Sequence, residues 1–498
     1  MGIDVDRIQF GDFQTPPALA ARVVELLRDR GLAPRTIVEP TCGTGAFVDA
    51  AATVFPDSTV LGYDVNPDHV RTAASSGRVR TAGRLSCEVA NFFEVDWAAR
   101  LAALSEPILV LGNPPWATSS GLGAIGGSNL PQKTNFQNRR GLDALTGKSN
   151  FDVAESMLLT LLEAGQQRDL TLAMLVKTSV ARRVLAHFWI KGAPVGAAAI
   201  YRFDAAGYFG VSADACLFLC QSGDVPVNDC LLADIERPDV VLGRIGWRDG
   251  ALVSDPVVYD RHRSLLVSNG PKTSGRWRSG VKHDCSAVME LRQIASGTFV
   301  NGSGVRVELE PDYVYPLLKG TDLVHGQVDR VRRWLVVTQS RPGDDTSVIA
   351  ERAPRTWAYL CANGERLDAR RSSIYRKRPR FSVFGVGPYT FAPWKVAISA
   401  LHKRLSFAVV GPHNARPVVL DDTCYHLSFE SEAHARQTAH LLNSEPCMEL
   451  LAAMVFWDAK RPITGDVLRR VDLRQVAICL GISSDGASPA LPVPVNLP

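Results

Sequence analysis

The sequence predicts an α/β fold in its first 240 residues, built on a doubly wound sheet, and an α+β region after it. Strand and helix signals alternate from Thr36 to Gln221, as they do in successive βαβ units. A glycine-rich turn directly follows the first strand, and an acidic residue ends the second. Beyond residue 240 this alternation stops, and short strand-like pieces, aromatic residues and basic clusters replace it.

The elements of the first region can be justified in order. Pro16 and Pro17 open an amphipathic helix over Ala18–Arg30, and Gly31 ends it. Apolar runs bounded by turn residues predict the strands, and apolar residues at helical spacing predict the helices. The predicted strands are Thr36–Glu39, Val60–Asp64, Ile108–Gly112, Leu170–Val176, Ala197–Phe203 and Ala215–Gln221. One predicted helix begins after Gly45, and two more cover Asp152–Ala164 and Ser179–Ile190.

Three domain-level segments follow from the composition along the chain. Residues 1–240 form the expected catalytic domain, interrupted at 117–150 by a stretch rich in Gly, Ser and Asn that predicts a mobile loop. Residues 241–482 form the second domain, with helices predicted over Ala433–Asn443 and Pro446–Trp457. Residues 483–498 are rich in Ser, Gly and Pro and are expected to be a disordered tail.

Size and composition exclude several classes of protein. A chain of 498 residues suits two or three domains. No apolar segment follows a basic N-terminal stretch, and no run of about 18 apolar residues occurs, so no signal peptide and no membrane helix are expected. The ten cysteines are scattered singly, which predicts no metal site and a reduced, cytoplasmic location.

The charge is distributed unevenly between the two halves of the chain. Residues 1–240 hold 21 Lys+Arg and 26 Asp+Glu, a net charge of −5, whereas residues 241–498 hold 34 and 25, a net charge of +9. This split indicates a catalytic module followed by a module that binds a polyanion, although an ordinary basic surface is the alternative. The candidate phosphate contacts are Lys133, Arg139, Arg140 and Lys148 in the 117–150 stretch and Arg376, Lys377, Arg378 and Arg380 in a dense basic cluster.

The glycine-rich turn, Glu39–Phe47, has the features of a nucleoside site. Gly43 and Gly45 let the backbone pass close to a ligand, and the amides at the start of the following helix can face a carboxylate. Asp64 ends the second strand, where its carboxylate can accept hydrogen bonds from both ribose hydroxyls. Val48 stands where a dinucleotide turn has its third glycine, which disfavours NAD.

The stretch from Asn113 to Trp116, Asn-Pro-Pro-Trp, follows the apolar strand Ile108–Gly112 and suits methyl transfer to a planar amine. Such an amine is a poor nucleophile because its lone pair is delocalised. The Asn113 side-chain oxygen and the Pro114 carbonyl can accept its two hydrogens, while Pro114 and Pro115 stiffen the turn. Trp116 offers a flat face on which a base can stack. A proline-rich turn without function is the alternative for the motif by itself.

Together these motifs resemble the S-adenosylmethionine-dependent DNA adenine methyltransferases of the gamma class. In that class the cofactor motifs precede the catalytic motif and a target-recognition domain comes last. The resemblance covers essentially the whole chain, and it implies a Rossmann-like methyltransferase sheet, S-adenosylmethionine as cofactor and double-stranded DNA as substrate. The cofactor-binding residues that it implies are Thr15, Glu39, Thr41, Gly43, Gly45, Asp64, Asn91, Phe92 and Asn113.

The same resemblance implies a catalytic set. In the motif that holds the adenine of the cofactor, Asn91 stands where the family usually has Asp, and its oxygen can still accept from the amino group of that adenine. Asp152 begins the next motif at a helix start, and Ser212 stands where some relatives carry Lys. The implied catalytic residues are Asn113, Pro114, Pro115, Trp116 and Phe209, the last packing on a flipped adenine, and the segments that resemble the recognition domain are Tyr315–Gly320, Phe391–Val396 and Asp421–Tyr425.

The implied activity is methylation of the adenine N6 amine in double-stranded DNA, at a specific site and after base flipping. The expected role is the modification enzyme of a restriction-modification or related defence system, a monomer with a separate cognate endonuclease. An RNA or protein-glutamine methyltransferase and cytosine-amine methylation remain alternatives. A catalytically silent DNA-binding subunit is a further one, disfavoured by intact Asn113 and Asp64.

Overall fold

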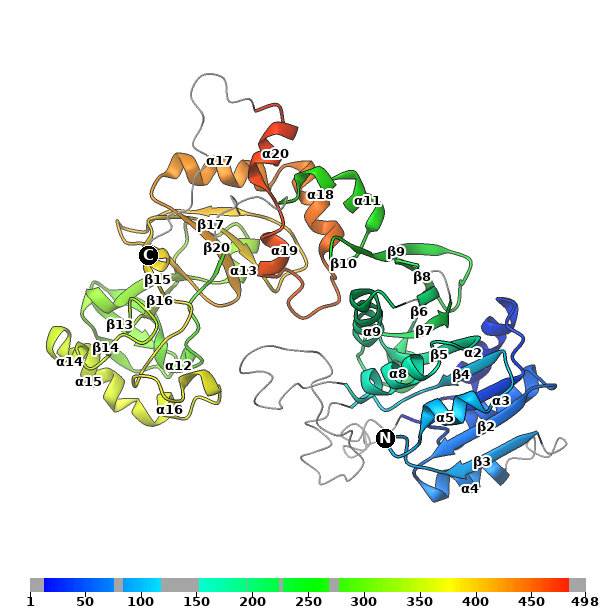
Figure 1. Ribbon diagram of the computed structural model, residues 1–498. Helices are drawn as coiled ribbons and strands as arrows, with labels where there is room; N and C mark the ends of the chain where they lie inside the picture. Colours follow the sequence, from blue (N-terminus) through cyan, green and yellow to red (C-terminus); the bar gives the residue numbers. More distant parts are fainter. Residues whose placement is uncertain are drawn as a thin grey trace. The chain divides into compact units, whose positions relative to one another are not determined.

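The computed structural model describes residues 13–75, 84–117, 152–193, 195–223, 227–267 and 277–482. The chain divides into two compact units, Met1–Pro256 and Val257–Pro498, each with a sheet framework of its own (Figure 1). The predicted loop residues 118–150 and the predicted tail lie outside the described residues. No helix in the described ranges is long and apolar enough to cross a membrane.

The first unit is built on a ten-stranded sheet with the order β10-β9-β8-β6-β7-β5-β4-β1-β2-β3. The strands are β1 (Thr36–Glu39), β2 (Thr59–Asp64), β3 (Leu85–Val89), β4 (Ile108–Gly112), β5 (Leu170–Lys177), β6 (Val195–Phe203), β7 (Ala215–Ser222), β8 (Asp229–Asp234), β9 (Val241–Arg248) and β10 (Ala251–Val253). The five strands β1 to β5 pair in parallel, whereas β7 is antiparallel to both β5 and β6. The predicted α/β sheet is therefore confirmed.

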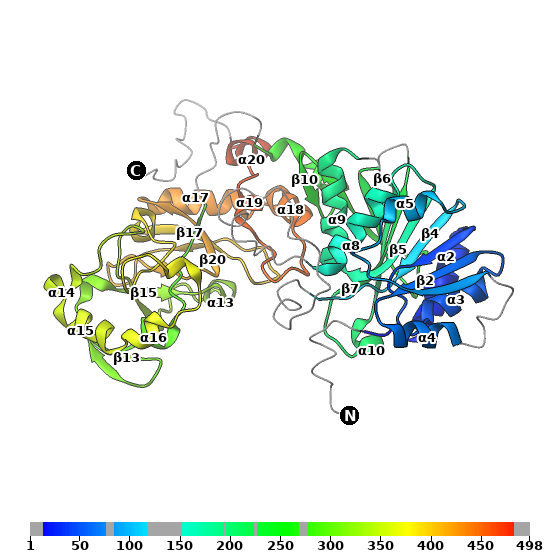
Figure 2. The ribbon, with the colours of Figure 1, turned by 60° about the horizontal axis from the view of Figure 1, so that its bottom comes forward.

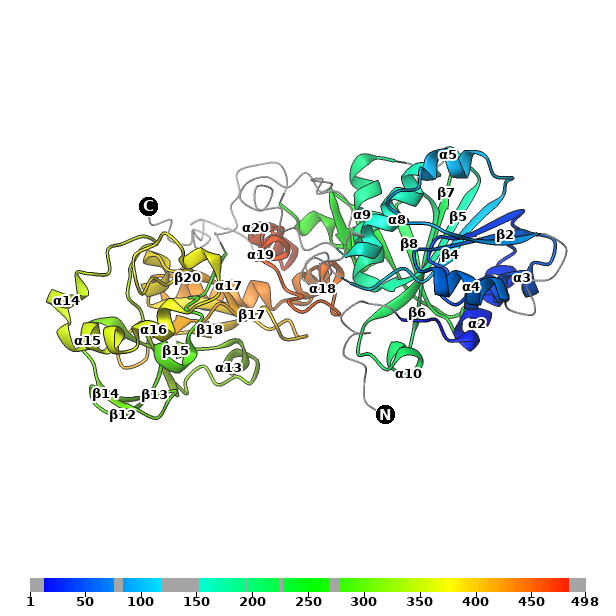
Figure 3. The same ribbon diagram turned by 90° about the horizontal axis from the view of Figure 1, so that it is seen from below.

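Helices cover both faces of this sheet, as Figure 3 shows. One face carries α2 (Pro17–Asp29), α3 (Ala46–Val54) and α4 (Pro67–Ser75), and the other carries α5 (Trp97–Ala102), α8 (Val153–Ala164) and α9 (Thr178–Lys191). This division follows from right-handed crossovers, because the chain moves along the sheet in opposite directions before and after β3. A short helix, α10 (Ala205–Phe209), connects β6 to β7.

The position of β1 determines where a ligand can bind. β1 pairs with β2 on one side and with β4 on the other, so the strand order reverses between β1 and β4. Every residue of both strands is buried. In open α/β sheets, ligands bind at the carboxyl ends of the strands beside such a reversal. The glycine-rich turn after β1 and the Asn-Pro-Pro-Trp turn after β4 both start at this edge.

The compact unit extends past residue 240, where the sequence predicted the boundary. β9 pairs antiparallel with β8, and β10 pairs antiparallel with β9, so both strands complete the first sheet. The first unit consequently ends at Pro256.

The second unit contains a four-stranded and a six-stranded sheet. The four-stranded sheet consists, in order, of β11 (Arg278–Ser279), β20 (Cys424–Phe429), β17 (Trp394–Ser399) and β18 (Ala408–Val410). The six-stranded sheet consists, in order, of β14 (Arg306–Glu308), β13 (Thr298–Asn301), β12 (Glu290–Ala295), β16 (Arg333–Val336), β15 (Val314–Leu318) and β19 (Val419–Leu420). Most pairs are antiparallel, and β15 with β19 is parallel.

Ten short helices accompany these two sheets among the described residues. They are α11 (Pro256–Arg261), α12 (Ser286–Met289), α13 (Gly320–Val324), α14 (Ile349–Arg352), α15 (Pro354–Ala362), α16 (Gly364–Asp368), α17 (Glu432–Leu442), α18 (Glu445–Met454), α19 (Gly465–Leu468) and α20 (Leu473–Cys479). Both predicted late helices are present as α17 and α18. Figure 2 shows α17 lying along β17 and β20, which gives the second unit its α+β character.

Candidate active site

A cavity of about 420 Å³ opens at the carboxyl ends of β1, β2 and β4. This volume lies in the range of cavities that hold small ligands and cofactors. Its walls come from the chain before α2, the two turns identified in the sequence, the segments after β2 and β3, and the start of α8. Of the predicted cofactor-binding residues, those that line it are Thr15, Glu39, Thr41, Gly43, Asp64, Phe92 and Asn113.

The two glycines of the turn after β1 have different roles. Both have positive φ angles, +48° at Gly43 and +94° at Gly45. A side chain at Gly43 would collide with Gln14 Oε1, whereas one at Gly45 would approach Ala73 Cβ of α4 to 2.9 Å. Gly43 lines the cavity, and Gly45 allows the turn to pack against α4 instead. Gln14 accepts a hydrogen bond from the Thr44 amide at 3.0 Å.

Asp64 at the end of β2 is held by donors on both carboxylate oxygens. The Gly43 amide donates to Oδ2 at 2.9 Å, the Asn66 amide donates to Oδ1 at 2.8 Å, and His69 Nδ1 lies 3.4 Å from Oδ1. A carboxylate has about four acceptor positions, so capacity remains for ribose hydroxyls. Asn66 and His69 also line the cavity. The sequence reasoning missed both, since neither belongs to a motif.

Glu39 and Thr41 line the cavity, and each has an unpartnered side-chain oxygen. Within the described part of the chain, Glu39 Oε2 and Thr41 Oγ1 are buried without a hydrogen-bond partner. Burial raises the pKa of Glu39 well above its ordinary value, because a carboxylate loses its hydration there. Buried polar groups in native proteins are nearly always satisfied, so both oxygens fit a bound ligand with donors or positive charge. S-adenosylmethionine carries an ammonium and a sulfonium.

Asn113 is oriented by a hydrogen bond that leaves its oxygen available. Its Nδ2 donates to the Phe13 carbonyl at 2.8 Å, which assigns the two ends of the amide. Its Oδ1 is buried without a partner among the described residues. Pro114 is buried and Pro115 lines the cavity. The turn therefore holds a ready acceptor beside the cofactor cavity before any substrate binds.

Three aromatic rings pack together next to this turn. Trp116 lies 5.8 Å from Phe13 and 5.3 Å from Phe209 between ring centroids, and Phe13 lies 6.1 Å from Phe209. Trp116 is only 7% exposed, and its Nε1 donates to the Leu175 carbonyl at 3.1 Å. The stacking roles predicted for Trp116 and Phe209 stay predictions.

Asn91 has a local role that its motif did not indicate. Its Oδ1 accepts from the Phe93 amide at 3.1 Å, and its Nδ2 donates to Glu94 at 2.9 Å, so the side chain stabilises the turn after β3. Asn91 does not line the cavity, whereas its neighbours Phe92 and Phe93 do. Phe92 is fixed by Trp97, whose Nε1 donates to the Phe92 carbonyl.

The basic residues predicted to contact DNA fall into two groups. Lys133, Arg139, Arg140 and Lys148 lie outside the described residues. Arg376, Lys377 and Arg378 are exposed in the second unit. Arg380 is also exposed, but its guanidinium donates to the Asp368 carboxylate at 2.8 Å, so it is engaged in an ion pair.

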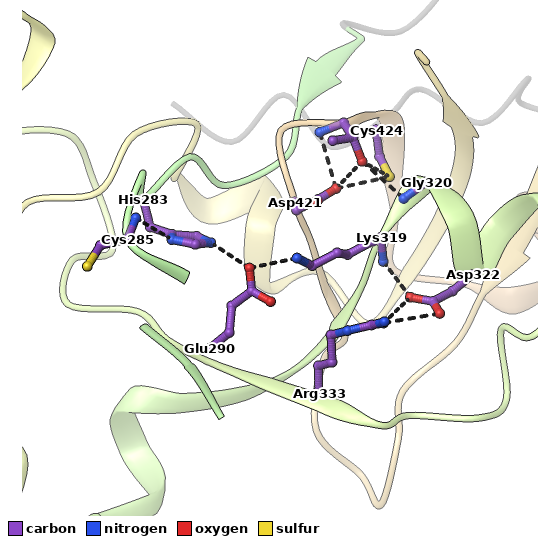
Figure 4. Close-up of polar contacts among 10 residues, drawn as sticks. His283, Cys285, Glu290, Lys319, Gly320, Asp322, Arg333, Asp421 and Cys424 are labelled. Atoms are coloured by element: carbon purple, nitrogen blue, oxygen red, sulfur yellow. Dashed lines mark hydrogen bonds and ion pairs between the residues drawn. The ribbon is translucent and has the colours of Figure 1, made fainter. Parts of the chain in front are cut away.

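The segments that resemble a recognition domain form the framework of the second unit. Figure 4 shows Glu290 at the start of β12 between His283 and Lys319. Lys319 Nζ donates to Glu290 at 2.7 Å, and His283 lies 3.3 Å from it. The Lys319 amide donates to Asp322, which also pairs with Arg333 at 2.9 Å. These polar contacts join the β11–β12 connection, β12, β15 and β16.

The described residues contain no cluster of three or more His, Cys, Asp or Glu side chains suited to a metal ion. All ten cysteines lie in the described ranges, and all are free thiols. Cys447, which follows Pro446 in α18, is fully buried, and burial raises its pKa to about 12. A thiol in this state is not a nucleophile.

The reversed strand order, the nucleoside-sized cavity and the Asn-Pro-Pro-Trp turn define an α/β methyltransferase whose cofactor is S-adenosylmethionine. The chain belongs to the type II methyltransferases. It is 41% identical over 478 residues to Type II methyltransferase M.NspV from Nostoc sp., an alignment that covers 95% of this chain and 98% of the relative.

More distant relatives match only parts of the chain. Release factor glutamine methyltransferase from Vibrio cholerae is 32% identical over 96 residues, 19% of this chain and 32% of its own. Among solved structures, TrmN from Thermus thermophilus is 16% identical with a TM-score of 0.26, over 42% of this chain and 49% of its own, and at that score the likeness supports no conclusion. No protein-family model matches the chain.

Proposed function

We propose that this methyltransferase transfers the methyl group of S-adenosylmethionine to the N6 amine of adenine in double-stranded DNA, at a specific sequence. The observation that carries the proposal is the state of Asn113. Its amide is oriented by the Phe13 carbonyl, its oxygen is buried without a partner among the described residues, and the residue lines the cofactor cavity. An acceptor fixed in this way suits an exocyclic amine, which has two hydrogens to donate.

The chemistry asks little of the protein beyond acceptors and positioning. S-adenosylmethionine supplies a methyl group activated by a positively charged sulfur. Asn113 Oδ1 and the Pro114 carbonyl withdraw the amine hydrogens from the plane of the base, which restores the lone pair of the nitrogen as a nucleophile. The turn is already ordered by two prolines, so little reorganisation accompanies the reaction. No general base is required beforehand, because the methylated nitrogen becomes acidic and can release its proton afterwards.

Duplex DNA is the proposed substrate because of the second unit. Residues 257–498 contain 32 Lys+Arg and 23 Asp+Glu, a net charge of +9, and the exposed Arg376, Lys377 and Arg378 can contact phosphates. The adenine must leave the helix to reach a cavity at a sheet edge. As the family resemblance implies, the enzyme is proposed to be a modification enzyme with a separate cognate endonuclease, acting as a cytoplasmic monomer.

Methylation of a protein glutamine is the second candidate, since one partial relative acts on glutamine by its name. A glutamine amide is also planar and also presents two hydrogens to the same acceptors. The matched region is only 19% of this chain, and a basic unit of some 240 residues has no evident purpose in that reaction.

The test is replacement of Asn113. Asn113→Ala removes the acceptor, and methyl transfer to duplex DNA is expected to slow by about 100-fold or more, while calorimetric affinity for S-adenosylmethionine stays close to the parent value. Asn113→Asp is the matched variant, because it keeps an acceptor but cannot donate to the Phe13 carbonyl. Its rate should fall between those of the parent and the alanine variant.

The modified atom is identified separately. Single-molecule sequencing of DNA from cells that express the protein is expected to reveal N6-methyladenine at one recurrent sequence. Unmodified DNA together with a methylated glutamine or RNA base would assign the enzyme to the alternatives. Activity of Asn113→Ala within a few-fold of the parent would refute the role of this side chain.

A further inference from the structure

Lys177 joins three elements that surround the catalytic turn. It ends β5, and its Nζ donates to the Trp116 carbonyl at 3.0 Å and to Asp152 Oδ2 at 2.8 Å. Asp152 is the N-cap of α8, where its Oδ1 accepts from the Ala154 amide at 3.2 Å. One ammonium group therefore connects the end of β5, the end of the Asn-Pro-Pro-Trp turn and the start of α8.

Two further hydrogen bonds make this junction rigid. The Val153 amide donates to the Ala117 carbonyl at 2.9 Å, and Trp116 Nε1 donates to the Leu175 carbonyl at 3.1 Å. Trp116 is thus held to the end of β5 through both its indole and its carbonyl. The two prolines constrain the turn on the Asn113 side, and Lys177 constrains it on the opposite side.

The junction also shapes the cavity. Val153 and Met157, in the first two turns of α8, line the cavity together with Asn113 and Pro115. The side chain of Asp152 is 6% exposed and that of Lys177 is 30% exposed, so this is a partly desolvated, charge-assisted contact. A shift of α8 relative to the turn would move the cavity wall and the amine acceptor with respect to each other.

We propose that Lys177 is a positioning residue for methyl transfer: it fixes the acceptor turn and the α8 wall at the separation that the reaction needs. Lys177 acts through the Trp116 carbonyl and Asp152 and need not touch the substrate. Misplacing a reacting group by about 1 Å can slow a reaction by about 100-fold, so the loss of this contact should appear in turnover. This inference rests on the proposed function, because its test measures methyl transfer to the amine.

The chain offers a closely matched control. Arg183 in α9 donates to Glu155 in α8 at 2.5 Å, and the Glu155 side chain is 6% exposed, as is that of Asp152. Glu155 lies three residues beyond Asp152 on the same helix. Both pairs place a cation against a buried carboxylate of α8. The two cations differ in one contact, because Lys177 also donates to the Trp116 carbonyl. Arg183→Met therefore reports the general cost of breaking such an ion pair.

The experiment compares the full-length Lys177→Met and Arg183→Met variants with the parent enzyme on duplex DNA. For Lys177→Met, kcat is expected to fall by about tenfold or more, while the KM and calorimetric affinity for S-adenosylmethionine stay within about twofold. Arg183→Met is expected to keep kcat within about twofold of the parent. Equal values of kcat in the two variants would overturn the proposal.

A double variant covers the case in which Lys177→Met is unstable. Lys177→Met leaves the Asp152 carboxylate buried without its cation, whereas adding Asp152→Asn removes that charge and keeps a side chain that can cap α8. The double variant should regain the thermal midpoint of the parent but keep the low kcat. Recovery of kcat together with stability would refute a positioning role. A parent enzyme that methylates no DNA would instead refute the proposed function, which is a distinguishable result.

Discussion

Three residues that line one cavity, Glu39, Thr41 and Asn113, each have a side-chain oxygen that is buried without a hydrogen-bond partner among the described residues. An unsatisfied buried polar atom costs roughly 1–3 kcal/mol. Three at one site are best understood as groups whose partners arrive with ligands. At the residue scale, these unpartnered oxygens lower the stability of the ligand-free protein and raise its affinity for ligands that supply the missing partners.

Replacing Glu39 with Gln tests this exchange. The pKa of Glu39 is raised by burial in the folded protein, whereas it is about 4.3 in the unfolded chain. The folded state consequently loses stability relative to the unfolded state as the pH rises from the unfolded pKa through the folded pKa. Because Gln does not ionise, Glu39→Gln should raise the thermal midpoint of the ligand-free protein at neutral pH, and by less near pH about 4.

The affinity of the same variant for S-adenosylmethionine should fall by about tenfold or more, since a neutral amide replaces a carboxylate beside a cationic ligand. Calorimetry measures both quantities. Glu25→Gln is the control, because Glu25 is exposed on α2 and should change neither. An unchanged affinity in Glu39→Gln would mean that the carboxylate does not face the cofactor.

At the scale of elements, polar contacts between strands organise the second unit. Glu290 at the start of β12 accepts from Lys319, directly after β15, and lies beside His283. Burial acts to raise the pKa of Glu290, but hydrogen bonds from His283 and Lys319 outweigh it, and the pKa is lowered. The ionised carboxylate is thus stabilised by the fold, and it stabilises the fold in return.

Glu290→Gln is expected to destabilise the six-stranded sheet by about 2 kcal/mol at neutral pH, the usual contribution of hydrogen bonds to a charged group. A lowered folded pKa contributes stability above the unfolded pKa of about 4.3, and this contribution disappears as the pH falls through the folded pKa. The difference between variant and parent should therefore vanish in acid. Hydrogen exchange across β12 and β15, measured for both proteins at each pH, checks this.

Glu308→Gln is the matched control in the same sheet. Glu308 ends β14 and lies 3.9 Å from Arg355, and both side chains are 60% exposed. Exposed ion pairs contribute little to stability. Faster exchange in Glu308→Gln than in Glu290→Gln would show that the buried position of Glu290 is not what matters.

At the scale of the whole molecule, the two units differ in the sign of their net charge. Residues 1–256 carry a net charge of −5 and residues 257–498 a net charge of +9. The candidate active site lies entirely in the first unit, which has a ten-stranded sheet and a hydrophobic core of its own. Cofactor binding and DNA recognition should accordingly be separable.

A truncation after Pro256 is expected to bind S-adenosylmethionine with nearly the affinity of the full chain, but to lose site-specific DNA binding. The loss is expected because the truncation removes the basic unit, and the phosphate contacts proposed for that unit predict that binding weakens with salt. Calorimetry reports the first property, and fluorescence anisotropy with labelled duplexes at several salt concentrations reports the second. Site-specific methylation by residues 1–256 alone would contradict this division of roles.

Much of the first unit could be predicted from the sequence because its strands are buried on both faces. β1 and β4 were predicted with the bounds that the structure has: β4 is a continuous apolar run, and β1 has a β-branched apolar centre directly before the glycine-rich turn. β3 was missed because it is the edge strand and all five of its residues are partly or fully exposed, so that no apolar run marks it. The extension of the sheet by β9 was also missed, because a pairing between strands leaves no local signal.

The sequence by itself determined the class of chemistry, methyl transfer from S-adenosylmethionine, because local motifs around Gly43, Asp64 and Asn113 carry the residue types that this chemistry needs. Only the tertiary structure decided how those residues are held. The Gly43 amide on Asp64, the Phe13 carbonyl on Asn113, and the junction at Lys177 join segments far apart in the chain. Such contacts depend on which strands become neighbours, and strand order is a property of the folded sheet rather than of any local sequence.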